Sequence, residues 1–232
     1  VRHFAEALGR LEKTDKIDAG VIAQFAQVRG LVGKPPASDK QKELKALVSH
    51  LRQLICARTV QKNQSKLVDE PLVIASRERL MASLNKEIRH MESLVAERIE
   101  DDPLWAKLDT AFREIKGVSY RTVACLMAEL PEIGTCSSKS IAKLAGLAPM
   151  AKDSGKSSGK RPVRGGRAHV RTILFVVAEL VRRYNKTFTE AHQRLVKAGK
   201  PKMVVRIALA RKLLVVLNAK ARDAREDMKI AT

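Results

Sequence analysis

Two long stripes of apolar side chains at helical spacing constrain the fold of this chain more than any other feature. The first stripe consists of Leu44, Leu47, Leu51 and Leu54. The second consists of Leu80, Leu84, Ile88, Met91, Val95 and Ile99. Residues spaced by three and four lie on one side of a helix, and proline ends a helix, so Pro71 and Pro103 bound these segments. Residues 38–103 therefore predict two long helices that pack as an antiparallel hairpin or coiled coil.

Shorter helices are expected on both sides of this hairpin. Thr14 can cap a helix that ends near Gly30, with Ile17, Val21, Ile22 and Phe25 on its apolar side. Gly33-Lys34-Pro35-Pro36 is typical of a linker. Beyond Trp105, residues 115–119 (IKGVS) resemble the turn of a helix-hairpin-helix, and residues 138–144 predict a short helix closed by Gly146.

The last third of the chain predicts two more helices after a glycine-rich basic loop. One is marked by Ile173, Val177, Leu180 and Tyr184, and the other by Ile207, Ala210, Leu214 and Leu217. Strand-like alternation is hardly visible anywhere. The expected fold class is therefore mostly α-helical.

The charge of the chain indicates a polyanionic partner. The 232 residues carry a formal net charge of +20 but only 3% aromatic residues, which favours Lys and Arg contacts with phosphates over base stacking. No apolar run approaches the ~20 residues of a membrane-spanning helix. Cys56, Cys125 and Cys136 lack metal-site spacing. We therefore expect a cytoplasmic protein that binds nucleic acid and no membrane.

Residues 152–171 combine a hydroxyl with many cations. Ser154 could attack a phosphodiester if nearby cations neutralised the growing charge, although Ser157 and Ser158 compete with it and a solvated loop explains the same composition. The candidate phosphate ligands here are Lys152, Lys156, Lys160, Arg161, Arg164, Arg167 and Arg171. On the polar side of the first long helix, the candidates are Arg52, Arg58 and Lys62.

Asp15 and Asp18 form the candidate metal-binding pair. They fall at i and i+3 in the first turn of a predicted helix, so both carboxylates lie on one face. Acids also collect in first turns because the helix dipole favours them there. Two-metal phosphoryl transfer gathers more carboxylates than two, so this pair is half a site.

Two separated blocks of the sequence resemble the IS110 family of insertion-sequence transposases. Residues 1–19 (VRHFAEALGRLEKTDKIDA) are similar to the end of its RuvC-like domain. Further on, LAGLAP at 144–149, Ser154-Gly155, RGG at 164–166, GKP at 199–201 and ARKLL at 210–214 follow the order of its C-terminal transposase domain.

This resemblance implies an enzyme and its site residues. The family's RuvC-like domain holds a DEDD metal site, and its C-terminal domain supplies a catalytic serine. Asp15 and Asp18 match the last two acids of that set, Ser154 matches the serine, and the implied cofactor is Mg²⁺. The family's first Asp and its Glu would lie upstream of Val1, so we expect this chain to be N-terminally truncated. The resemblance also implies DNA as substrate, a structured guide RNA, and a homo-oligomer, a dimer or tetramer.

The sequence thus predicts three domains. Residues 1–34 would be the remnant of a RuvC-like α/β domain, 38–103 a helical hairpin, and 104–225 the serine-bearing transposase domain. The predicted function is that of a DNA transposase or recombinase. The competing hypotheses are a fragment that binds RNA or DNA without catalysis, and a structural protein that only dimerises through its hairpin.

Overall fold

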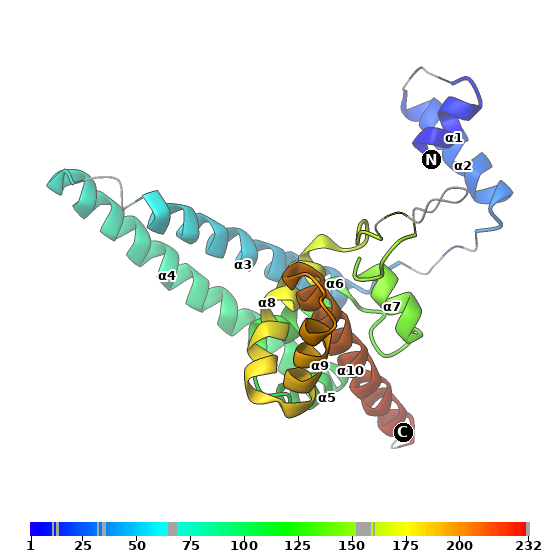
Figure 1. Cartoon of the computed structure of the whole chain (residues 1–232). Coiled ribbons are helices and arrows are strands. Elements are labelled where there is room, and N and C mark those ends of the chain that lie inside the picture. Colours follow the sequence, from blue (N-terminus) through cyan, green and yellow to red (C-terminus); the bar gives the residue numbers. More distant parts are fainter. Residues whose placement is uncertain are drawn as a thin grey trace. The chain divides into compact units, whose positions relative to one another are not determined.

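The structure is a computed structural model that describes residues 1–10, 12, 14–31, 33, 36–64, 69–151, 159 and 161–230 (Figure 1). The helices of these residues are α1 (Arg2–Ala7), α2 (Asp15–Val28), α3 (Asp39–Gln64), α4 (Pro71–Glu100), α5 (Pro103–Arg113), α6 (Tyr120–Glu129), α7 (Ser138–Leu144), α8 (Ala168–Tyr184), α9 (Lys186–Lys197) and α10 (Lys202–Ile230). The only β-type pairing among the described residues is an isolated bridge between Pro149 and Val163. The predicted fold class, mostly α, is confirmed.

The chain divides into two compact units, Val1–Ser38 and Asp39–Thr232. The first unit contains α1 and α2. Thr14 caps α2 as predicted, because its hydroxyl accepts a hydrogen bond from the Ile17 amide at 3.3 Å. Val21 is buried, whereas Ile22, also on the predicted apolar side, is 53% exposed.

In the second unit, α3 and α4 form an antiparallel hairpin. Their side chains pair in reverse order along the two helices: Arg98 binds Glu43 at 2.7 Å, Arg58 donates to Asn85 at 3.2 Å, and Arg77 donates to Gln64 at 3.2 Å. Figure 1 shows the two helices side by side, reaching away from the rest of their unit. The buried members of the two predicted stripes are Leu44, Leu51, Ile88, Met91, Val95 and Ile99.

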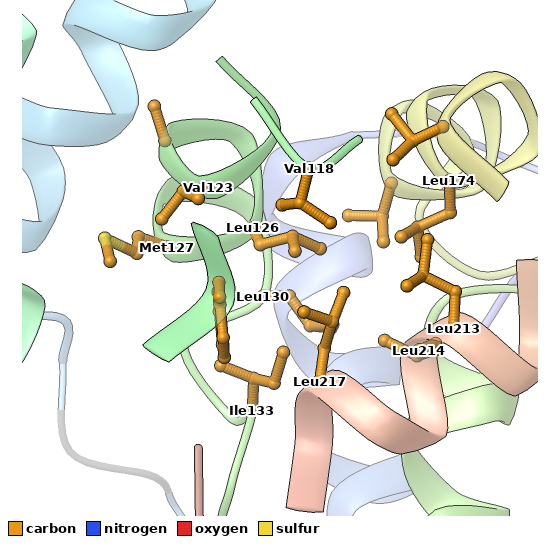
Figure 2. Packing of buried hydrophobic residues seen from close by; sticks show 14 of the residues in the cluster. Val118, Val123, Leu126, Met127, Leu130, Ile133, Leu174, Leu213, Leu214 and Leu217 are labelled. Carbon is orange, nitrogen blue, oxygen red and sulfur yellow. The ribbon is translucent and has the colours of Figure 1, made fainter. Parts of the chain in front are cut away.

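Helices α5, α7, α8 and α9 surround α10, which is buried along much of its length. Leu213, Leu214 and Leu217 are each 0% exposed. Figure 2 shows them gathered with residues of α6, of the segment after α6 and of α8 in one core. Burial of this many apolar side chains is the main force that stabilises the unit.

Helix α8 packs one of its two apolar stripes against this core. Its buried residues are Val170, Leu174, Val177, Ala178 and Val181. Leu180 and Tyr184, which marked this helix in the sequence, lie within it as predicted but are 40% and 59% exposed. Most positions of α8 are apolar, and two stripes satisfy the same helical spacing.

The helix ends follow local chemistry that is visible in the sequence. Asp102 caps α5 by accepting hydrogen bonds from the amides of Leu104 and Trp105, with Pro103 as first helical residue. Gly146 follows α7 with a φ of +68°. Within the described ranges, no helix is both long and apolar enough to cross a membrane.

Candidate functional site

The described structure brings together the two family-like segments that flank the predicted serine. Pro149 and Val163 pair as an antiparallel bridge. The Met150 amide donates to the Pro162 carbonyl at 3.0 Å, and the Arg167 amide donates to the Leu144 carbonyl at 2.9 Å. We call this paired base, residues 144–150 with 162–167, the loop stem. It holds both ends of the segment that carries Ser154 at one place.

Two glycines make the loop stem possible. Gly146 and Gly166 have φ values of +68° and +65°, a region that residues with a side chain rarely adopt. A Cβ on Gly146 would lie 2.2 Å from the Gly165 carbonyl oxygen, and a Cβ on Gly166 would lie 2.3 Å from the Gly146 nitrogen. The backbones therefore cross in direct contact, and any side chain at either position would separate them.

The predicted nucleophile itself lies outside the described residues. Ser154 and the loop cations Lys152, Lys156 and Lys160 all fall there. The structure describes the loop stem, from which the segment with these residues begins and at which it ends.

The cations at the loop stem are used in different ways. Arg164 is exposed, and among the described residues it has no ion-pair partner. Arg171 donates to the Gly165 carbonyl at 2.7 Å and so braces the crossing. Arg161 is also exposed.

Arg167 forms the tightest ion pair of this region. Both its terminal nitrogens reach Glu132, at 2.5 and 2.6 Å, in a bidentate geometry. Hydrogen bonding to that carboxylate raises the pKa of Arg167 above its ordinary value, against partial burial. The contact with Glu132 links the residue before α8 to the segment before α7. Binding of a phosphate by Arg167 stays a prediction.

The candidates on α3 also have partners within the protein. Arg52 lies 3.4 Å from Glu129, and Arg58 donates to Asn85 on α4 at 3.2 Å. Lys62 is exposed near the end of α3. Arg52 therefore links α3 to α6 and Arg58 links α3 to α4, and contact with a phosphate backbone stays a prediction for all three.

Asp15 and Asp18 occupy the first turn of α2, as expected. Asp15 is exposed, while Asp18 lines a hollow of about 580 Å³ with Glu6, Glu12 and Arg10 among its neighbours. Glu6 itself is engaged by His3 at 3.0 Å and Arg2 at 3.1 Å. Hydrogen bonds from His3 and then Arg2 lower the pKa of Glu6.

The donor chemistry of this pair suits a hard cation, but the pair is not a complete site. Carboxylate oxygens are the ligands that Mg²⁺ takes in proteins. Among the residues whose positions are described, no group of three or more His, Cys, Asp or Glu is arranged to hold a metal. Asp15 and Asp18 would therefore supply only part of a magnesium site.

Asn218 holds the turn before α7 in place, a role that the sequence did not predict. It is fully buried in α10; its Oδ1 accepts from the Gly134 amide at 2.9 Å, and its Nδ2 donates to the Cys136 carbonyl at 3.0 Å. It thus fixes the turn that leads into α7. The sequence does contain a signal, a single Asn among the apolar residues of this helix. Because buried polar groups need partners, such an Asn indicates a structural hydrogen bond.

Comparison with known proteins shows which family this chain resembles. A family model described as "Transposase IS116/IS110/IS902 family" matches residues 109–193, and a DEDD-type transposase model of IS110 matches residues 1–68. A "Pilin gene-inverting protein" of Moraxella bovis is 29% identical over 97% of this chain and 71% of its own length. The protein of the same name in Moraxella lacunata matches to the same extent. The chain belongs to the IS110 family of transposases.

The two matched regions of this IS110-family transposase contain the two halves of the candidate site. Residues 1–68 include Asp15 and Asp18, and residues 109–193 include the loop stem with both crossing glycines. The protein is therefore a DNA transposase or site-specific recombinase, and DNA is its partner.

Proposed function

We propose that this transposase cuts and joins DNA with the hydroxyl of Ser154 as nucleophile. The single observation that supports the proposal most is the loop stem, which gathers the motifs on both sides of Ser154 and leaves Arg164 exposed at their base. A cation there could neutralise charge that develops on a phosphate during attack.

The proposed step is a transesterification. The Ser154 oxygen forms a bond to phosphorus, the phosphodiester bond to one deoxyribose oxygen breaks, and that oxygen leaves as a hydroxyl after taking up a proton. The serine proton passes to solvent or to a neighbouring base. The product is a phosphoserine linkage to DNA, which the reverse reaction with another strand's hydroxyl would resolve.

We also propose that Asp15 and Asp18 hold part of a magnesium site for this reaction. When bound, the metal would polarise the phosphate and stabilise charge on the reacting oxygens. The two carboxylates would bind it through oxygen and hold it at the start of α2, where Thr14 fixes the helix cap.

Guide RNA and oligomerisation are further parts of the proposal. Both are implied by the resemblance to the family, and the basic character of the chain, with a net charge of +20, suits an RNA as well as a DNA partner. In a dimer or tetramer, Ser154 of one subunit could act with the acids of another. The α3–α4 hairpin, as a coiled coil, is the element we propose for subunit contact.

The turn between α5 and α6 is proposed to act as a helix-hairpin-helix. Gly117 has a φ of +105°, and a Cβ there would lie 3.1 Å from the Val181 nitrogen, so the turn packs closely on α8. Ser119 precedes α6 at a helix start whose amides could bind a DNA phosphate.

Recombination chemistry is tested with Ser154→Ala in the full chain. We expect loss of strand exchange and of any covalent protein–DNA adduct on a denaturing gel, with DNA binding retained. Ser157→Ala and Ser158→Ala are matched controls that should keep both activities. A covalent adduct in the Ser154→Ala variant would contradict the proposal.

The metal proposal has its own test. Asp15→Asn and Asp18→Asn should each raise the magnesium concentration needed for cleavage, and titration of Mn²⁺ monitored by its paramagnetic signal should show weaker binding. If both variants bind the metal like the unmodified protein, the acids are ordinary first-turn residues.

The alternative function is nucleic-acid binding without catalysis. The observation that favours it is that the described residues give Asp15 and Asp18 no third metal ligand. A cleavage assay with Mg²⁺ separates the two, because both functions predict binding that weakens steeply with salt and only the enzyme forms the adduct.

A further inference from the structure

A second basic surface lies at the other end of α7 from the loop stem. A groove of about 910 Å³ opens between the turn before α7 and the last turns of α10. We call it the α10 groove; its lining residues include Thr135, Cys136, Ser138, Arg222, Arg225, Glu226 and Lys229. None of these belongs to the predicted site.

The wall of the α10 groove is held firmly in place. Gly134 has a φ of +85°, and a Cβ on it would lie 2.8 Å from the Ala221 carbonyl, so the turn rests directly on the backbone of α10. Arg225 donates to the carbonyls of Ile133 at 3.0 Å and Pro131 at 3.2 Å. With the two hydrogen bonds of Asn218, these contacts preform the groove before any ligand binds.

The groove carries more positive than negative charge. Arg222, Arg225 and Lys229 line it at i, i+3 and i+7 of α10, against one carboxylate, Glu226. Arg222 and Lys229 are exposed and form no ion pair within the part of the chain that the structure describes. One turn before the groove, Lys220 of the same helix is paired with Glu114 at 2.5 Å. The groove therefore holds two cations whose charge is not neutralised by a described neighbour.

The spacing of these cations matches a nucleic-acid strand. Seven residues of helix advance about 10 Å. One strand of duplex DNA carries a phosphate every ~3.4 Å along the axis, so Arg222 and Lys229 together span about three phosphates. On the opposite wall the hydroxyl of Ser138 can donate to a phosphate oxygen, whereas that of Thr135 donates to the Glu132 carbonyl at 2.8 Å.

Helix α7 connects the α10 groove to the loop stem. It begins at Ser138, a residue of the groove, and ends at Leu144, whose carbonyl accepts from Arg167 in the stem. Between them, Lys143 and Ser140 line a hollow of about 690 Å³ that also contains Arg164. Polar and basic side chains thus continue from one end of α7 to the other.

We propose that the α10 groove binds the phosphate backbone of the DNA strand that continues, along α7, from the segment engaged at the loop stem. This inference rests on the proposed function, because it assumes that DNA is engaged there. The groove is a positioning surface, and its residues take no part in the chemical step.

The test is the double variant Arg222→Ala with Lys229→Ala in the full chain. Arg225 is left intact because it holds the turn. A matched control, Arg194→Ala with Lys197→Ala, removes the same two charges from exposed positions of α9. With a labelled DNA duplex, we expect the groove variant to bind roughly ten-fold more weakly. The slope of log affinity against log salt should fall by about 0.9 for each phosphate that the variant no longer neutralises.

The variant Glu226→Gln should change the affinity for DNA in the opposite direction. Removal of the one carboxylate among the described residues that line the groove should tighten DNA binding, whereas a purely structural role of these residues predicts no gain. Alkylation of Cys136 adds a local readout, since bound DNA should slow its modification in the unmodified protein more than in the groove variant.

Clear outcomes overturn the inference. They are unchanged affinity and salt slope in the groove variant, an equal loss in the α9 control, a loss confined to an RNA probe, or no effect of DNA on Cys136. Thermal unfolding of each variant shows that it is folded. The result is separable from the proposed function, because a groove variant with normal affinity would leave the Ser154 adduct, and hence the catalytic proposal, intact.

Discussion

At the residue scale, the contact between Gly146 and Gly166 is the least replaceable feature of the candidate site. Each glycine combines a positive φ with a neighbouring backbone where its Cβ would lie. Gly165, between them in the same stem, has a φ of +69° but open space around it. A substitution at Gly165 therefore tests backbone strain alone, whereas a substitution at Gly146 or Gly166 tests strain together with a steric clash.

Alanine at the crossing should destabilise the protein and disrupt the loop stem. We expect Gly146→Ala and Gly166→Ala each to lower the free energy of unfolding by more than about 2 kcal/mol, because strain and overlap add. Gly165→Ala, with strain only, should cost about 1 kcal/mol. Denaturant unfolding measures all three, and equal losses would show that the backbones can separate.

Cys125 predicts a pH effect on reactivity and on stability. Burial raises the pKa of its thiol from 9.0 to about 11. Because the unfolded thiol ionises first, the stability present below pH 9.0 should decline as pH rises toward 11. Iodoacetamide at pH ~8 should label exposed Cys56 well before Cys125, as mass spectrometry would show. A Cys125→Ala variant should lose less stability than the unmodified protein between pH 9.0 and 11.

At the element scale, the α3–α4 hairpin separates structural from exposed apolar residues. Leu44 is 0% exposed against α4 and the core, whereas Leu72, in the first turn of α4, is 80% exposed. The two leucines have the same chemistry and differ only in burial.

Their alanine variants should therefore behave differently. Leu44→Ala should cost about 2–5 kcal/mol because burial is reduced and a cavity forms. Leu72→Ala should change stability by no more than about 0.5 kcal/mol in the monomer. Chemical denaturation checks both. A large loss at Leu72 that depends on protein concentration would indicate that a second copy covers the tip of the hairpin.

The elements also show what the sequence could and could not predict. Pro71, Pro103 and Thr14 act locally, so the helix boundaries they set were predictable. The buried face of α8 was not, because docking on α10 selected one of two comparably apolar stripes. The crossing of Gly146 with Gly166 was likewise hidden, since each glycine alone is typical of an ordinary turn.

At the scale of the whole molecule, the two compact units differ greatly in their cores. Residues 39–232 contain an extensive cluster of buried apolar side chains, whereas Val21 is the only buried residue described in residues 1–38. A unit with its own core can fold alone.

We accordingly expect a protein of residues 39–232 to unfold cooperatively, with a Tm within a few degrees of that of the full chain. Calorimetry would measure this, and circular dichroism would check that the helices persist. It should still bind DNA through its basic surfaces and should form no recombination product, because the proposed metal-binding pair, Asp15 and Asp18, is removed. Loss of cooperative unfolding would show that the first unit contributes to the core of the second.

The bridge between Pro149 and Val163 has a broader consequence. It fixes the two ends of residues 150–162 next to each other, whatever number of residues connects them. When the two ends of a loop are fixed, added residues increase the entropic cost of closing it only slowly. Insertions between these two ends should therefore leave the stem in place while they lengthen the segment that carries Ser154, the proposed nucleophile.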